Sequence, residues 1–253
     1  FIAPWWVSVR FFMNLFDQNF TAEQLQDGHL IAIDKPLHWT SFQVVNKVRW
    51  HLQNHCKIKK LKVGHAGTLD PLATGLLLLC TGKMTKSIEQ LQGQEKVYTG
   101  QFVLGASTPS YDLETPIDQY FPTEHITAEK IREVAQQFTG TIDQKPPLFS
   151  ALKKEGRRLY EIARAGETVE IASRKVHIAS FEMTAIELPI LSFRVRCSKG
   201  TYIRSLAHDF GKALDTGAHL SQLRRTAIGE HHVDNAFHLE IEENQTQAQY
   251  KEN

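Results

Sequence analysis

The chain has 253 residues and a mass of 28.8 kDa, a length that suits one large domain or two small ones. Hydrophobic residues make up 42% and charged residues 23%, which excludes a disordered tail and a collagen-like repeat. The net charge of +1 indicates no particular partner. Cys56, Cys80 and Cys197 are far apart and lack the paired spacing of metal sites. We therefore expect reduced thiols, no metal and a cytoplasmic protein.

The first sixteen residues are apolar, but Arg10 interrupts them and they fall short of the roughly 20 residues of a membrane helix. The order of a signal peptide is also missing. Because the chain starts with Phe1 and Met13 is a plausible start, we expect residues 1–12 to be an upstream extension. An apolar segment packed on the body is the alternative. We expect no membrane association.

Basic residues gather in blocks although the total charge is balanced. Residues 47–62 hold six Lys or Arg and no acid, and 194–225 hold seven against two acids. A third block, 153–175, holds seven basic residues and four acids. Segregated positive charge favours a surface that binds a polyanion. Solvated surface lysines are the simpler explanation for any single block.

In the first half of the chain, the sequence patterns predict three strands and one helix. Residues 29–34 form a short apolar strand, 76–80 (LLLLC) a central buried strand, and 97–105 a strand with Tyr98 and Phe102 on one face. A helix is expected from Ser41, with Thr40 or Ser41 as its N-cap. Its apolar positions at helical spacing are Phe42, Val45, Val48 and Leu52.

The second half continues the alternation. Thr127 can cap a helix with Ile131 and Phe138 on its apolar face, and residues 191–198 alternate like a strand buried on one side. A helix is expected to start at Thr201, with the apolar stripe Ile203, Leu206, Ala207, Phe210 and Leu214. The fold class is therefore mixed α/β.

The glycine-rich loop VGHAGTLDPLATGLL (63–77) is the most distinctive segment. Gly67 permits unusual backbone angles, and Pro71 keeps Asp70 out of helical conformation. The loop matches no phosphate-binding motif. A lone carboxylate held on such a turn suits nucleophilic or base chemistry, although an Asp that merely closes a turn is common.

The residues of this loop resemble the signature of the TruB-type tRNA pseudouridine-55 synthases. The resemblance extends from about residue 30 to residue 229 and continues through the blocks DKP (34–36), KVYTG (96–100), 146–166, 197–211 and 217–229. It implies a pseudouridine synthase fold, in which helices flank a mixed central sheet and a thumb insertion grips RNA. Here the thumb would span about 146–174.

The resemblance also implies a reaction and its residues. The family breaks the N-glycosidic bond of a uridine in the T-arm loop of tRNA and rejoins C1′ to C5, without metal or cofactor. Asp70 matches the catalytic aspartate, and Arg204 matches the arginine that pairs with it. Tyr98 matches the tyrosine that stacks on the flipped base, although packing beside Phe102 would also explain it. Acylal, Michael and glycal pathways all remain open.

The remaining residues implied by the resemblance would bind RNA. His65 matches the histidine that fills the space left by the flipped base, and Lys35 matches a lysine with a structural or RNA-contacting role. The thumb would grip the RNA backbone with Lys153, Lys154, Arg157, Arg158, Tyr160 and Arg164. The role of the block 223–225 stays open.

The sequence departs from the family in two places. Where the family often has Asp-Thr, residues 108–112 read TPSYD, so only the second acid, Asp112, is kept. After the catalytic domain (30–229), the acidic tail (230–253) is too short for the C-terminal RNA-binding domain of many relatives; residues 1–29 form an N-terminal extension. We therefore expect an enzyme that acts on tRNA without an obligate protein partner. The alternatives are a guide-RNA-dependent synthase and a non-catalytic tRNA-folding factor.

Overall fold

The computed structural model describes residue 15 and residues 19–150, 152–154, 156–167 and 169–239. The predicted extension, residues 1–12, lies outside this part of the chain, as do residues 240–253 of the tail. In the described part, no helix is long and apolar enough to span a membrane.

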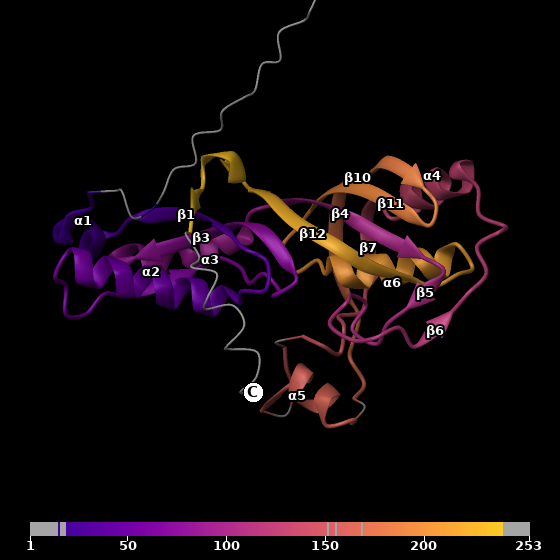
Figure 1. Cartoon of the computed structure of the whole chain (residues 1–253), viewed down its shortest axis with the longest axis horizontal. Coiled ribbons are helices and arrows are strands. Elements are labelled where there is room, and N and C mark those ends of the chain that lie inside the picture. Colours follow the sequence, from indigo (N-terminus) through magenta and orange to yellow (C-terminus); the bar gives the residue numbers. More distant parts are fainter. Residues whose placement is uncertain (1–14, 16–18, 151, 155, 168, 240–253) are drawn as a thin grey trace, which may run out of the picture.

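A long mixed sheet runs through the molecule and joins its two halves (Figure 1). Within the described residues its strand order is β14 (Phe237–His238), β1 (Leu30–Lys35), β3 (Ala73–Thr81), β12 (Ala218–Ile228), β4 (Lys96–Leu104), β11 (Ile190–Cys197), β10 (Arg174–Glu187) and β7 (Gly140–Gln144). Strand β2 (Val63–His65) pairs with β3, and β13 (His231–His232) pairs with β12. The β1–β14 and β3–β12 pairs are parallel and the others are antiparallel. The expected mixed α/β class is confirmed.

Helices cover both faces of the sheet in the N-terminal half. Helix α2 (Ser41–His55) packs on one face of β1 and β3, and α3 (Ile88–Gly93) packs on the other. This explains why Leu76 to Cys80 are all fully buried, as expected for LLLLC. Thr40 caps α2 in a capping box with Gln43. Phe42, predicted on the apolar stripe, is instead 66% exposed, and Val44 takes its place in the core.

Helices cover a single face of the sheet in the C-terminal half. Helices α4 (Ala128–Gln137, capped by Thr127) and α6 (Ile203–Ala213) pack with β4, β10 and β11 around a cluster of phenylalanines. Burial alternates along β11 because its other face carries exposed Arg194 and Arg196. Helix α6 begins two residues later than predicted. The reason is that Tyr202 exchanges hydrogen bonds with the Gln144 side chain, which keeps its backbone extended.

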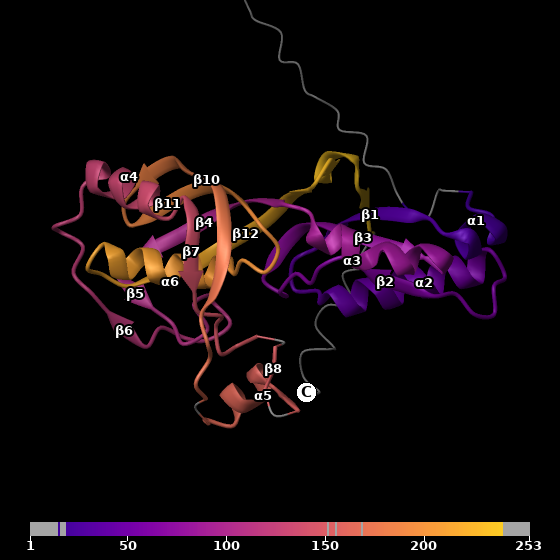
Figure 2. The same ribbon diagram turned by 180° about the vertical axis from the view of Figure 1, so that it is seen from behind.

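The segment predicted as the thumb connects the antiparallel neighbours β7 and β10 and projects from the body (Figures 1 and 2). It carries the two-stranded hairpin of β8 (Lys153–Lys154) and β9 (Arg157–Arg158) and the helix α5 (Leu159–Arg164). The remaining elements are α1 (Ala22–Asp27), β5 (Ala106–Ser107), β6 (Gln119–Tyr120) and the 3-10 helices η2 (Gly82–Ser87) and η3 (Val233–Asn235).

Candidate active site

A cleft of about 620 Å³ opens where the two halves of the sheet meet. Asp70, Tyr98 and Arg204 all line it, so the fold brings together the three predicted catalytic residues. Among the described lining residues Asp70 is the one acid, whereas the basic ones are Lys96, Arg174, Lys175, Lys199, Arg204 and Arg225. The cleft therefore attracts a polyanion.

Asp70 lies on the turn that leads from β2 into β3, and local contacts fix this turn. Gly67 has a φ of 109°, which a side chain would strain. The Ser41 hydroxyl accepts a hydrogen bond from the Leu69 N–H at 2.8 Å and lies 3.1 Å from the Leu69 carbonyl. The first turn of α2 thus holds the residue before Asp70, and the carboxylate itself remains 39% exposed to the cleft.

Arg225 of β12 supports the same loop from beneath. Its guanidinium is almost fully buried and donates to three carbonyls, those of Leu76 at 2.8 Å, Gly67 at 3.0 Å and Thr68 at 3.3 Å. A Cβ on Gly75 would overlap the Arg225 backbone, so this glycine lets β12 approach β3. The sequence left the role of the block 223–225 open. In the structure, Arg225 of this block holds the backbone of the glycine-rich loop.

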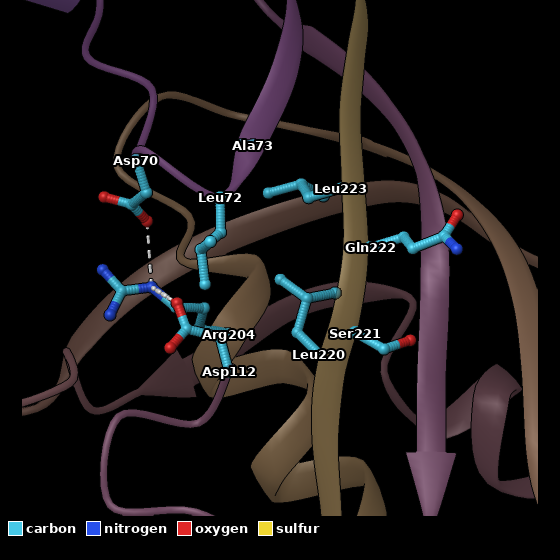
Figure 3. A pocket seen from close by; sticks show the side chains of 9 residues that line it. All are labelled: Asp70, Leu72, Ala73, Asp112, Arg204, Leu220, Ser221, Gln222 and Leu223. Carbon is cyan, nitrogen blue, oxygen red and sulfur yellow. Dashed lines mark ion pairs between the residues drawn. The ribbon is translucent and has the colours of Figure 1, made fainter. Parts of the chain in front are cut away.

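Arg204 is buried between two carboxylates (Figure 3). Its Nε lies 2.9 Å from Oδ2 of Asp70 and 3.6 Å from Oδ2 of Asp112. The Nη1 atom donates to the carbonyls of Phe149 at 2.9 Å and Ser110 at 3.3 Å. These bonds fix the guanidinium plane, so it meets Asp70 in one orientation. On sequence alone this would have been a surface arginine, but it is one of the most buried charges here.

Asp112 belongs to this network. It is the acid that is kept in segment 108–112, where the sequence departs from the family. Burial raises the pKa of Asp112, and the Arg204 charge opposes the shift. Its Oδ1 accepts from the Glu114 N–H at 3.0 Å, while the Thr108 hydroxyl donates to its carbonyl at 2.6 Å. The second acid of the motif therefore holds the far side of Arg204.

Tyr98 points from β4 into the cleft and is also buried in the core cluster that contains Phe102. Its position in the cleft is compatible with stacking on a base, and its place in the core cluster is compatible with packing beside Phe102. Burial raises the pKa of Tyr98, and the neighbouring Arg225 charge opposes this shift. The neutral phenol is therefore favoured near pH 7.

Lys35 at the end of β1 and His65 in the first part of the loop do not line the cleft. Lys35 is fully buried, and its Nζ donates to the carbonyls of Trp39 at 2.6 Å and Pro36 at 2.8 Å. Burial lowers the pKa of Lys35 to about 8, although the Asp70 charge counteracts the shift. Burial also lowers the pKa of His65 on β2, so its ring is neutral at pH 7.

The six predicted thumb residues lie away from the cleft and from Asp70. Lys153 and Lys154 pair with Arg158 and Arg157 across the hairpin of β8 and β9. Tyr160 on α5 lies under the guanidinium groups of Arg164 and Arg158, at 5.6 and 5.8 Å from its ring centroid. The base of the thumb does reach the cleft, through Ser150 and Leu152.

Sequence reasoning missed four basic residues of the cleft: Lys96, Arg174, Lys175 and Lys199. Lys96 lies in the KVYTG block, and its position next to Tyr98 could have indicated it. Burial lowers the pKa of Lys96 to about 8. Arg174 lies 4.8 Å from the centroid of the Tyr202 ring, a contact between distant segments that no local pattern indicates.

The fold, a large mixed sheet with helices on its faces, is that of a pseudouridine synthase. Residues 53–203 match the TruB family pseudouridylate synthase N-terminal domain, and residues 204–252 match the tRNA pseudouridylate synthase B C-terminal domain. The chain belongs to the TruB family of pseudouridylate synthases, and the predicted membership is confirmed.

Individual relatives agree with the family match. The chain is 62% identical over 228 residues to the tRNA pseudouridine synthase B of Flavobacterium johnsoniae, covering 90% of this chain and 100% of the relative. It is 55% identical over 207 residues to that of Parabacteroides distasonis, covering 82% and 88%. Among solved structures, a Cbf5-Nop10-Gar1 complex gives a TM-score of 0.60 at 32% identity, over 83% of this chain. The match spans about half, 52%, of that longer chain. The predicted pseudouridine synthase fold is confirmed.

Proposed function

We propose that this chain converts the uridine at position 55, in the T-arm loop of tRNA, to pseudouridine. The carrying observation is the Asp70 carboxylate, 2.9 Å from the buried Arg204 and exposed at the mouth of a basic cleft. The name tRNA pseudouridine synthase B, borne by a relative matched over its whole length, supports tRNA as the substrate.

The reaction requires one carboxylate and involves no net oxidation or reduction. The bond between C1′ and N1 of the uridine breaks, a bond between C1′ and C5 forms, and the proton on C5 leaves while N1 gains one. Asp70 serves as the nucleophile or base in this exchange, and the Arg204 guanidinium pairs with its carboxylate at 2.9 Å. Because Arg204 is held by backbone carbonyls, the carboxylate is presented in one geometry.

The target base has to leave the RNA stack before Asp70 can reach it. Tyr98, in the same cleft, stacks on the flipped uracil, and His65 fills the space that the base leaves in the RNA. Lys35 fixes the segment 36–39 through the carbonyls of Pro36 and Trp39, and this segment binds the loop because the His38 N–H donates to the Pro71 carbonyl at 2.8 Å. The cleft needs no cofactor for these steps.

The RNA backbone is held by the basic cleft and by the thumb residues Lys153, Lys154, Arg157, Arg158, Tyr160 and Arg164. Their exposed charges suit contacts with phosphate groups. The enzyme works on tRNA in the cytoplasm and needs no obligate protein partner. A guide-RNA-dependent synthase is the less favoured function, because the relatives at 62% and 55% identity, covered over 100% and 88% of their length, are both named tRNA pseudouridine synthase B.

Asp70→Asn tests this function on an isolated T-arm hairpin. The substitution keeps the size of the side chain and removes its charge, so hairpin binding should persist while pseudouridine formation falls below detection. Asp27→Asn, at an exposed ion pair with Lys83, is the matched control and should keep wild-type turnover. A sizeable fraction of wild-type turnover by Asp70→Asn would remove Asp70 from the mechanism. A wild-type chain that binds the hairpin without modifying it would leave the folding-factor alternative.

A further inference from the structure

Helix α2 presents two large aromatic side chains to solvent. Phe42 is 66% exposed and Trp50 is 62% exposed. Eight residues separate them, which is slightly more than two helical turns, so both side chains lie on the face opposite the core. Asn46 and Arg49 share this face, and the Arg49 guanidinium donates to Oδ1 of the Asn46 side chain at 2.6 Å. Exposed aromatic groups gathered on one helix face indicate a binding surface.

The charge around this face is positive. Residues 47–62 contain six Lys or Arg and no acid. Lys57, Lys59, Lys60 and Lys62 are all exposed in the segment that follows α2. Aromatic rings surrounded by basic side chains match the chemistry of unpaired nucleotides, whose bases stack and whose phosphates carry negative charge. A protein partner would need acidic groups to meet this charge.

The position of α2 connects this face to the catalytic loop. Its first residue, Ser41, is hydrogen-bonded to Leu69, the neighbour of Asp70. With a rise of about 1.5 Å per residue, Trp50 lies roughly 14 Å further along the helix axis. The buried face of α2 packs on β1 and β3, so its open face points away from the sheet. Figures 1 and 2 place α2 and the thumb on the same side of the molecule.

We propose that the α2 face formed by Phe42, Asn46, Arg49 and Trp50 binds unpaired nucleotides of the tRNA outside the T-arm hairpin. This rests on the proposed function, since it assumes that the hairpin occupies the cleft. Trp50 and Phe42 stack on bases, and Arg49 with the lysines that follow contacts phosphates. The surface lengthens the RNA-binding region beyond the cleft and the thumb and favours whole tRNA over its isolated hairpin.

The test compares two ligands, an unmodified full-length tRNA and its isolated T-arm hairpin, and uses the Phe42→Ala/Trp50→Ala variant. Affinity for the full tRNA should fall at least about fivefold, the loss of one stacked base, while hairpin affinity and turnover stay at wild-type values. Tyr120→Ala, which removes a 77% exposed ring on β6 at the other end of the molecule, is the matched control. Trp50→Phe should retain most of the affinity because it keeps a stacking face.

Three results would overturn the proposal. If the double variant bound tRNA with unchanged affinity, the α2 face would have no role in RNA binding. Altered self-association of that variant would then show that the face is a protein–protein contact. Equal losses on tRNA and hairpin would place the effect in the cleft. A melting temperature well below that of Tyr120→Ala would show that the aromatic rings are covered by the chain itself. If the wild type modified neither ligand, the proposed function would fail instead.

Discussion

The glycine-rich loop (residues 63–77) leads from β2 into β3, and the thumb (146–174) connects β7 and β10, but the described residues of the two regions are held by different kinds of contact. Buried groups hold the loop: the Arg225 guanidinium on three carbonyls and the Ser41 hydroxyl on Leu69. Ion pairs between exposed side chains hold much of the thumb, namely Arg157–Glu167 at 2.9 Å and Arg164–Glu114 at 3.2 Å. Its helix α5 buries Leu159 and Ile162 outside the three apolar clusters of the body.

This difference follows what each region does in the proposed reaction. A hydrogen bond made in a dry interior is costly to lose, so buried bonds keep a carboxylate in one place, as chemistry at a single bond requires. An exposed ion pair contributes little to stability and exchanges readily with other partners. Arg157 and Arg164 can therefore separate from Glu167 and Glu114 and pair with phosphate groups when RNA binds.

The largest expected effect comes from removing the buried clamp. Arg225→Met keeps much of the side-chain volume but leaves the carbonyls of Gly67, Thr68 and Leu76 without their donor. Each unpaired buried group costs about 1–3 kcal/mol, so the free energy of unfolding should drop by a few kcal/mol and turnover should drop with it. Urea denaturation measures this. Exposed Arg194→Met is the control, and an equal, small change in both variants would contradict the clamp.

A second pair of variants separates stacking on the flipped base from filling of the space that the base leaves in the RNA. Tyr98→Phe keeps the ring and loses the hydroxyl, so tRNA binding should survive while turnover slows. His65→Ala should raise the cost of flipping, which is a few kcal/mol to begin with, and its defect should shrink on a substrate whose uridine is already unstacked. Single-turnover rates on both substrates measure this, with exposed His232→Ala as the control. Identical defects on every substrate would show that the two roles are wrongly assigned.

The buried lysine behind the loop predicts a dependence of stability on pH. The folded chain releases the Lys35 proton near pH 8, whereas the unfolded chain keeps it to about pH 10.5. Unfolding therefore takes up a proton within this window, and the contribution of Lys35 to the free energy of unfolding rises with pH from 8 to 10.5. Lys35→Met should lose this part of the rise, measured by denaturation across the window, and should keep the part that comes from Lys96, whose pKa is also lowered to about 8. Exposed Lys83→Met should keep both parts. A rise of wild-type size in Lys35→Met would exclude the buried charge as its source.

The smallest effect on stability is expected in the thumb. Arg157→Ala breaks an exposed ion pair with Glu167, and the melting temperature should stay the same. Binding of tRNA should nevertheless weaken, and the slope of log affinity against log salt should fall by about 1 for the lost phosphate contact. Lys130→Ala on α4, which breaks a comparable exposed pair, should change neither quantity. A drop in melting temperature for Arg157→Ala alone would mean that this exposed ion pair stabilises the thumb, as buried hydrogen bonds stabilise the loop.

Most secondary structure could be read from local patterns. The strand at 76–80, the Thr40 and Thr127 caps and the alternation along 191–198 are confirmed because their signals lie within a few residues. Phe42 fits the apolar spacing of α2 but is exposed, since spacing alone does not say which hydrophobic side chain meets the core. The start of α6 was misplaced because Gln144, 58 residues from Tyr202, decides it.

The sequence by itself determined the family and the mixed α/β class and predicted Asp70 as the catalytic residue, because the GHAGTLDPLATG signature is contiguous and long. Only the tertiary structure decided how the carboxylate is held. Arg204, Asp112 and Arg225 come from distant segments, and burial turns their ordinary charges into fixed supports. The exposed aromatic face of α2 was likewise hidden in the sequence, since exposure depends on which side of the helix packs against the sheet. Burial is a property of the assembled fold, and spacing along the chain only constrains it.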